Sequence, residues 1–239
     1  HLTAVGVAAN FLNNVFNDKT DVQTDEYDIV VAQDGSGDYL RVQDAIDAVP
    51  DFRKQPTRIF IRIGFYDEKI VIPETKQDLF LVGEDKFKTI ISYNNYASKH
   101  VAIGGELGTS GSASIYITPN RFTAESITFE NAAGPVGQAV AAIVRSDEAQ
   151  FINCRFLGFQ DTLYTHKPGS KQYYHNCYVE GTVDFIFGAS TAYFEECDIY
   201  CKRNGYITAA STPEGQPYGY VFQNCRITGE NPDSFYLGR

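Results

Sequence analysis

Two aspartates stand at equivalent places in two successive stretches that are rich in aromatic residues. Asp161 lies in "GFQDTLY" and Asp184 in "GTVDFIFG", and each follows a cysteine, Cys154 or Cys177, by seven residues. Aspartate is uncommon in β-strands and is rarely buried without a partner, so this pair needs a structural or a chemical reason. One protonated carboxyl group beside one carboxylate can perform acid-base and nucleophilic chemistry on an ester or a glycoside.

Two glutamines accompany these aspartates. Gln160 directly precedes Asp161, and Gln138 lies 22 residues before Gln160, in "GPVGQAV". Side-chain amides are uncharged hydrogen-bond donors, and such donors beside a carboxylate pair suit an oxyanion that forms on a carbonyl carbon. A ladder of stacked aspartates in solvated turns is the structural alternative, and it has no need of the glutamines. The pattern therefore favours acyl-transfer chemistry.

The elements that would position these side chains follow from a repeat centred on four cysteines. Each stands in the frame aromatic-x-x-Cys-x-apolar, in "FINCRF", "YHNCYV", "FEECDI" and "FQNCRI", and "AESITF" fits with Ile127 in the cysteine's place. The five marker positions are separated by 27, 23, 20 and 28 residues. Spacing of this kind is typical of a solenoid coil.

Short alternating runs of aromatic, aliphatic and polar residues surround the markers, and this periodicity predicts strands. The gaps between them are too short for crossover helices. Strands that recur once per coil stack in parallel as a single-stranded β-helix, an all-β fold with equivalent positions in register. Asp161 and Asp184 should then lie on adjacent coils about 4.8 Å apart. The pKa of one of them should rise unless a cation intervenes.

One stretch has helical periodicity instead. In "RVQDAIDAVP", apolar residues recur at i, i+3, i+4 and i+7 from Val42 to Val49, and Pro50 ends the pattern. We expect a short helix here that caps the N-terminal end of the solenoid. No shift in composition divides the chain after about residue 27, so we expect an N-terminal extension over 1–27 and one parallel β-helix domain over 28–239.

Composition excludes several classes of protein. The chain has 30 acidic and 20 basic residues, a net charge of −10, and no long basic cluster, so we expect no nucleic-acid partner. No apolar run approaches the roughly 20 residues that span a bilayer, so we expect no membrane partner. Neither the four histidines nor the five cysteines show a metal-binding spacing, so we expect no metal. We interpret most cysteines as buried thiols, and a disulfide between Cys197 and Cys201 stays open.

Six motifs together resemble the pectin methylesterases, particularly those of bacterial type. They are "GFYDE" (64–68), "GPVGQAV" (134–140), "GFQDTLY" (158–164), "GTVDFIFG" (181–188), "ITAASTPE" (207–214) and "YLGR" (236–239). The resemblance runs from about "VVAQDGSGDY" (30–39) to the last residue. The combination of QDTLY and DFIFG at this spacing is highly specific.

The resemblance implies a right-handed parallel β-helix that removes methyl esters from galacturonate units of pectin and releases methanol, without metal or cofactor. By motif, Asp184 resembles the nucleophile, and Asp161 resembles the acid that protonates methanol and then the base that activates water. Gln138 and Gln160 resemble the oxyanion donors, and Arg239 the arginine that keeps the nucleophile ionised. We expect a monomer that acts on methyl-esterified pectin and that, because of where this substrate lies, is secreted.

The resemblance also implies a set of substrate-binding residues: Ser114, Gln138, Tyr164, Val183, Phe187 and Arg239. Ser114 stands where the family usually has threonine, and it keeps the hydroxyl group. Core packing explains Tyr164, Val183 and Phe187 equally well when each is taken singly. Family members commonly continue "LGR" with Pro-Trp, whereas this sequence ends at Arg239, so we expect the closing coils to be missing.

Two other functions stay open at this stage. A β-helical glycoside hydrolase acting on the same polymer is one, because carboxylates about 5 Å apart suit a retaining glycosidase. The glutamines argue against it, since they serve an acyl oxyanion better than an oxocarbenium ion. A non-catalytic β-helix that binds polysaccharide is the other, although all five proposed catalytic residues are present.

Overall fold

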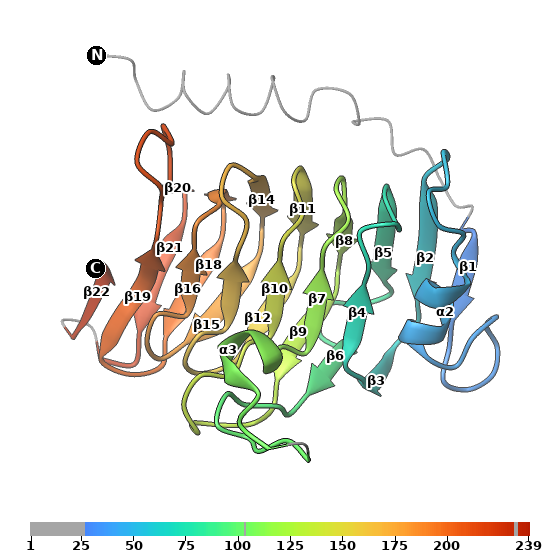
Figure 1. The fold of residues 1–239 in the computed structure, drawn as a ribbon, viewed down its shortest axis with the longest axis horizontal. Coiled ribbons are helices and arrows are strands. Elements are labelled where there is room, and N and C mark those ends of the chain that lie inside the picture. The colour runs from blue at the N-terminus through green and yellow to red at the C-terminus, as the bar shows by residue number, and fades with distance from the viewer. Residues whose placement is uncertain (1–26, 103, 232–233) are drawn as a thin grey trace.

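The computed structural model of the chain describes residues 27–102, 104–231 and 234–239, so all of the predicted N-terminal extension except Tyr27 lies outside the described residues. Short strands stack along one long axis into three sheets (Figure 1). The strands of neighbouring coils pair in parallel throughout the described part of the chain. The predicted single-stranded parallel β-helix is therefore confirmed, and its right-handed sense stays a prediction.

Each sheet takes one strand from each successive coil. Sheet A contains β1 (Ile29–Val31), β2 (Thr57–Ile61), β5 (Leu79–Gly83), β8 (Thr123–Glu125), β11 (Ala149–Ile152), β14 (Lys171–His175), β17 (Thr191–Glu195) and β20 (Tyr220–Gln223). Sheet B contains β3 (Gly64–Asp67), β6 (Thr89–Tyr93), β9 (Thr128–Asn131), β12 (Arg155–Leu157), β15 (Tyr178–Gly181), β18 (Asp198–Cys201) and β21 (Arg226–Gly229). Sheet C contains β4 (Ile70–Ile72), β7 (Ile115–Ile117), β10 (Ala142–Val144), β13 (Leu163–Thr165), β16 (Ile186–Gly188), β19 (Gly205–Ala210) and β22 (Phe235–Gly238).

A short helix lies at the first coil, as predicted. Helix α2 (Val42–Ala48) buries Val42, Ala45 and Ile46 and packs on β1, β2 and β4 at the N-terminal end of the solenoid (Figure 1). The buried Glu68 carboxylate accepts hydrogen bonds from the main-chain N–H groups of Val42 (2.9 Å) and Gln43 (3.1 Å). A negative charge at a helix N-terminus is stabilising. Glu68 lies between β3 and β4, so its two hydrogen bonds hold the N-terminus of α2 against this coil.

Alternation of inward and outward side chains along the strands builds one continuous core. Its central feature is a column of rings on four strands of sheet A, which we call the inner ladder: Phe151, Tyr174, Phe194 and Phe222. Successive ring centroids lie 4.9, 4.6 and 4.9 Å apart with nearly parallel planes. The Tyr174 hydroxyl donates to Gln172 Oε1 (2.8 Å), so the one polar group in this column is satisfied.

The cysteine frame found in the sequence marks the corner between sheet A and sheet B. The residue before each of these cysteines has a φ between 52° and 55°: Asn153, Asn176, Glu196 and Asn224. Asparagine tolerates this left-handed conformation better than most residues, which explains its place before three of the four cysteines. All five cysteines are free and four are buried, so the interpretation as buried thiols is confirmed, and Cys197 and Cys201 are not joined.

A long connection joins β6 to β7. It protrudes from the stack of strands and carries the short helix α3 (Gly108–Gly111) (Figure 1). The Tyr116 hydroxyl of β7 donates to the main-chain oxygen of Ser110 in this helix (2.6 Å). No helix in the described ranges is long and apolar enough to cross a membrane.

Candidate active site

Asp161 and Asp184 occupy the same position of two adjacent coils. Each stands two residues before a strand of sheet C, and these strands, β13 and β16, pair Leu163 with Ile186. The main-chain N–H of Asp161 donates to the carbonyl oxygen of Val183, the residue before Asp184 (3.2 Å). The stacking that the repeat predicts is therefore present in the structure.

Both aspartates adopt a left-handed backbone conformation, with φ of 65° for Asp161 and 51° for Asp184. This conformation turns the chain from sheet B into sheet C, and aspartate tolerates it better than most residues. Each aspartate is only 8% exposed. The corner thus holds two carboxyl groups of neighbouring coils at the edge of the core, where water screens them poorly.

Arg239 supplies a cation to one of the two carboxylates. Its Nε donates to Asp184 Oδ1 (3.1 Å) and its Nη2 to Asp184 Oδ2 (2.6 Å), a two-pronged contact between residues 55 positions apart. The planar guanidinium matches a carboxylate in this geometry, which fixes the orientation of the carboxylate. The Arg239 side chain is 60% exposed and that of Asp184 is 12% exposed, so the pair lies at the surface with its carboxylate on the inner side.

The pKa of Asp161 is raised to about 7, mainly because burial disfavours its charged form and secondly because the Asp184 carboxylate is close. The positive charge of Arg239 and a hydrogen bond from Gln160 act in the opposite direction and are outweighed. Near neutral pH, Asp161 can therefore hold a proton beside the arginine-bound carboxyl group of Asp184. An acid of this pKa can both donate and accept a proton near pH 7.

The two glutamines lie on adjacent coils at this corner. Gln138 and Gln160 form an isolated parallel bridge, and the main-chain N–H of Ala139 donates to the carbonyl oxygen of Gln160 (3.1 Å). The carbonyl oxygen of Gln138 accepts from the main-chain N–H of Ala97, in the long β6–β7 connection (2.8 Å). Gln138 is exposed and Gln160 is half-buried, so both side-chain amides lie where an added ligand can reach them.

Tyr164 and Phe187 belong to a column of outward residues on sheet C, which we call the outer ladder: Tyr116, Ile143, Tyr164 and Phe187. The Tyr164 and Phe187 rings stack with centroids 4.1 Å apart and planes 18° apart. Both rings are half-buried, as is Val183 beside Asp184. These three predicted substrate-binding residues therefore lie on the outer side of sheet C or at its corner, not in the core.

Ser114 is not brought to this surface. It is fully buried, and its hydroxyl donates to the main-chain oxygen of Glu130 (2.7 Å). A buried hydroxyl that is satisfied by the backbone holds two segments together, and it has no path to a polysaccharide in this structure. We therefore leave Ser114 out of the candidate site.

Two tyrosines extend the aspartate column and were missed in the sequence. Tyr206 pairs with Tyr236, and Tyr206 lies two residues before Thr208, the partner of Ile186. Their rings lie 5.5 Å apart at 34°, and the Tyr206 carbonyl oxygen accepts from the main-chain N–H of Asp184 (2.7 Å). The seven-residue offset that finds the aspartates gives Asn204 after Cys197, so the register read from the cysteines does not find these tyrosines.

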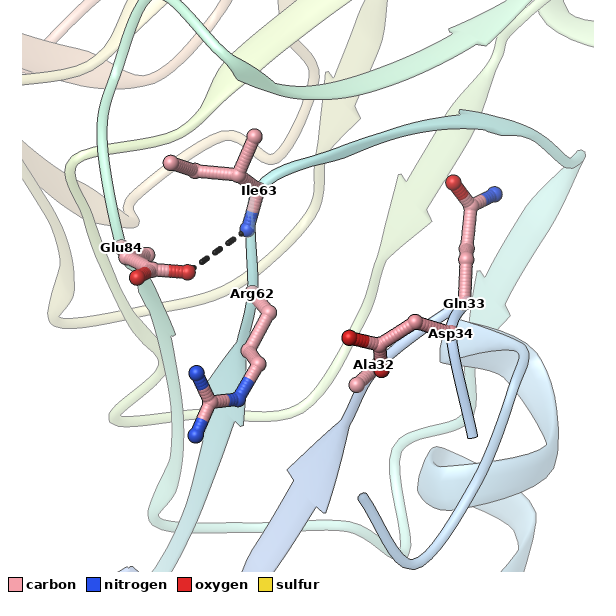
Figure 2. A pocket seen from close by; sticks show the side chains of 6 residues that line it. All are labelled: Ala32, Gln33, Asp34, Arg62, Ile63 and Glu84. Atoms are coloured by element: carbon pink, nitrogen blue, oxygen red, sulfur yellow. Dashed lines mark hydrogen bonds between the residues drawn. The ribbon is translucent and has the colours of Figure 1, made fainter. Parts of the chain in front are cut away.

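A separate cavity of about 270 Å³ lies at the first coils, at the other end of the solenoid from Arg239, and is lined by Ala32, Gln33, Asp34, Arg62, Ile63 and Glu84 (Figure 2). Glu84 accepts the main-chain N–H of Ile63 (2.9 Å), and Gln33 donates to the main-chain oxygen of Phe65 (2.8 Å). These polar groups serve the local fold. No group of three or more His, Cys, Asp or Glu side chains that could hold a metal occurs among the residues that the structure describes.

Comparison with known proteins places the chain in a family. The family model for pectinesterase matches residues 28–239. Pectinesterase 31 of Arabidopsis thaliana is 48% identical over 218 residues, which are 87% of this chain and 68% of that protein. A pectin methylesterase from carrot is similar in structure, with a TM-score of 0.81, 37% identity, and coverage of 91% of this chain and 70% of that one. A pectin methylesterase in complex with a hexasaccharide has a TM-score of 0.82, 32% identity, and coverage of 90% and 71%.

The chain spans a smaller share of other relatives, between 33% and 57% of the length of seven further Arabidopsis pectinesterases. These matches do not separate bacterial from plant members, so the bacterial type stays a prediction. The family match covers both aspartates, both glutamines and Arg239. The chain belongs to the pectinesterase family of carboxylic ester hydrolases, and its parallel β-helix is similar to the solved pectin methylesterases over most of its length.

Proposed function

We propose that this chain hydrolyses methyl esters of galacturonate units in pectin, with Asp184 as the nucleophile, Asp161 as the acid and base, and Gln138 and Gln160 as oxyanion donors. The observation that carries the proposal is the asymmetry of the two carboxyl groups. Asp161 has a pKa of about 7, whereas Asp184 is bound by the Arg239 guanidinium. One acid and one nucleophile thus coexist at neutral pH.

In the first half of the reaction, a carboxylate oxygen of Asp184 attacks the ester carbonyl carbon. The carbonyl oxygen becomes an oxyanion, which accepts hydrogen bonds from the Gln138 and Gln160 amides. As the tetrahedral intermediate collapses, its bond to the methoxy oxygen breaks and that oxygen takes the Asp161 proton, so methanol leaves. The galacturonyl group is then joined to Asp184 as a mixed anhydride, and Asp161 is ionised.

In the second half, ionised Asp161 accepts a proton from a water molecule, whose oxygen attacks the galacturonyl carbon. The same amides stabilise the second oxyanion. The bond to Asp184 breaks, which restores the Asp184 carboxylate beside Arg239, and the product forms as a galacturonic acid unit, which ionises in water. Asp161 holds the proton again, so the net reaction consumes one ester and one water and forms one acid and one methanol.

Two features support a polymeric sugar as the substrate. The rings of Tyr164 and Phe187 follow the aspartates along their strands, and the Tyr206–Tyr236 pair continues the aspartate column on the next coils. Such rings offer flat apolar surface to a sugar face. One of the similar pectin methylesterases was solved in complex with a hexasaccharide. Secretion is part of the same proposal, because pectin is an extracellular polymer, and a monomer stays a prediction.

The test is release of methanol from highly methylated pectin, measured beside the formation of new reducing ends in the same sample. Methanol without new reducing ends supports the proposal. New reducing ends would instead favour the glycoside hydrolase, and binding to pectin without either product would favour a non-catalytic binding protein. The Asp184→Asn variant is the inactive control for methanol release, because it keeps the shape of the side chain and removes the proposed nucleophile.

A further inference from the structure

One asparagine of the chain is followed directly by glycine. Asn204 and Gly205 form the sole Asn-Gly pair of the sequence, in "KRNGYI" (202–207), at the bend that leads into β19. Asn204 is exposed, and its side chain has no hydrogen-bond or ion-pair partner in the parts of the chain that the structure describes. No contact therefore holds its amide away from the main chain that follows it.

An asparagine in this position can lose its side-chain amide without any enzyme. Glycine has no side chain to hinder its main-chain nitrogen, so the Gly205 nitrogen can attack the Asn204 side-chain carbonyl carbon. The C–N bond of the amide breaks, and its nitrogen leaves as ammonia with the proton from the Gly205 nitrogen. Water opens the resulting succinimide ring at either carbonyl, which gives aspartate or isoaspartate at position 204. No oxidant or reductant takes part.

Gly205 is closely packed, so the fold tolerates no larger residue beside Asn204. A Cβ atom on Gly205 would lie 2.6 Å from the main-chain oxygen of Thr182 and 2.9 Å from Cγ2 of Val183. Favourable contacts of carbon atoms lie at about 3.5–4.0 Å, so such an atom would clash. Gly205 thus packs against the two residues that precede Asp184, the proposed nucleophile.

Hydrogen bonds connect the same strand to the Asp184–Arg239 pair. The main-chain oxygen of Tyr206 accepts from the N–H of Asp184 (2.7 Å), and that of Thr208 accepts from the N–H of Arg239 (3.4 Å). Both partners of the ion pair are therefore held by β19. A change in the path of the main chain just before Tyr206 acts directly on the position of Asp184.

We infer that Asn204 is a site of spontaneous deamidation, and that isoaspartate at this position inactivates the enzyme by displacing Asp184. Isoaspartate routes the main chain through the former side chain, which adds one carbon atom, about 1.5 Å, before Gly205. Gly205 has no room to move towards Thr182 or Val183, so the displacement falls on β19 and the Asp184 N–H that it binds. A reacting group displaced by about 1 Å can lose about a hundredfold in rate.

The test follows the modification and the activity of the same samples during incubation of the wild type at mildly alkaline pH. Peptide mapping by mass spectrometry measures the conversion of each asparagine to an acid, and enzymatic methylation of isoaspartate distinguishes the two products. Methanol release from methylated pectin measures the activity. The fraction of activity lost should equal the fraction of molecules with isoaspartate at position 204, because each such molecule is about a hundredfold slower.

Asn94 is the internal control. It is also exposed and its side chain has no partner in the described chain, but Asn95 follows it in place of glycine, so it should stay unmodified while Asn204 reacts. Asn204→Gln cannot form the five-membered ring and should keep its activity through the incubation. Freshly prepared Asn204→Asp adds the negative charge to an unchanged main chain and should be about as active as the wild type.

Three results would overturn the inference. Equal modification of Asn204 and Asn94 would exclude the site. Full activity of molecules with isoaspartate at position 204 would exclude the effect on Asp184. Loss of activity by Asn204→Gln at the wild-type rate would assign the loss to another residue.

The effect on activity rests on the proposed function, whereas the modification does not. Fresh wild-type protein that releases no methanol would contradict the proposed function alone, because mass spectrometry still measures the modification of Asn204. The melting temperature then tests the displacement. Incubated wild type should melt at a lower temperature than incubated Asn204→Gln, and equal melting temperatures would overturn the displacement.

Discussion

The inner ladder of sheet A and the outer ladder of sheet C are both built by stacking side chains of successive coils, but they differ in burial. The inner ladder places Phe151, Tyr174, Phe194 and Phe222 in register inside sheet A, where all but Phe222 are fully buried or nearly so. The outer ladder places Tyr116, Ile143, Tyr164 and Phe187 in register on the outside of sheet C. A parallel coil stacks whatever residue occurs at a given place in each turn, and the face of the sheet decides how much of the stack stays exposed. In the outer ladder Ile143 is buried and its three aromatic neighbours are half-buried.

Two aspartate–arginine pairs show the same contrast for charge. Asp198 and Arg226 form a two-pronged contact on the outer face of sheet B, with the Asp198 side chain 48% exposed. Asp184 and Arg239 have the same contact, but the Asp184 side chain is 12% exposed and a second carboxyl group, Asp161, lies on the next coil. Exposed pairs contribute little to stability, about 0–1 kcal/mol. Burial and the neighbouring acid distinguish the second pair, and the proposed reaction depends on both.

The largest expected effect comes from removing the proposed nucleophile, and it compares the Asp184–Arg239 pair with the exposed Asp198–Arg226 pair. Asp184→Asn should lower the rate of methanol release by about 10⁴-fold or more, as loss of a nucleophile does in other hydrolases. Asp198→Asn, its matched control, should leave the rate unchanged. Steady-state kinetics on methylated pectin measures both, and equal activity of Asp184→Asn and the wild type would exclude Asp184 as the nucleophile.

The next effect concerns the oxyanion donor. Gln160→Ala should lower the rate by about 10²- to 10³-fold because it removes a donor to the oxyanion. It also removes a hydrogen bond that lowers the pKa of Asp161, so the fall in activity above about pH 7 should move to higher pH. A pH profile of kcat/KM tests both parts. An unchanged rate with an unchanged profile would reduce Gln160 to a packing residue.

A pair of substitutions sharpens the comparison of the two ladders. Phe194→Ala should lower the free energy of unfolding by about 3–5 kcal/mol, because it leaves a cavity between Tyr174 and Phe222. Tyr164→Ala removes a half-buried ring and should cost less stability, but it should raise KM for pectin. Chemical denaturation measures the first effect and kinetics the second. Equal losses of stability would mean that the outer ladder serves the core.

The smallest effect is a stability difference that depends on pH. The pKa of Asp161 in the folded protein, about 7, exceeds its ordinary value of 3.8, so the folded state binds this proton more tightly than the unfolded chain. The corresponding stability is fully present below about pH 3.8 and is lost as pH rises through about 7. Asp161→Asn cannot ionise, so its melting temperature relative to the wild type should rise over this range. A constant difference would contradict the raised pKa.

Several features of the fold and the site were predicted from the residues. The cysteine frame identified the coil, because each cysteine follows a left-handed corner residue that recurs once per turn. The seven-residue offset placed Asp161 and Asp184 on adjacent coils, as the structure has them. The burial of Ser114 was not foreseen, because a motif match carries a residue's identity but not its burial.

The sequence by itself determined the coil, the parallel stacking and the juxtaposition of the two aspartates, because all three depend on a local period that one strand imposes on the next. Only the tertiary structure decided which stacks lose their water, which carboxyl group meets Arg239 from 55 residues away, and which donors are left unsatisfied at Arg145. These properties depend on the packing of several coils around each side chain, and the dielectric and the hydrogen-bond partners at a site exist only once the coils are assembled.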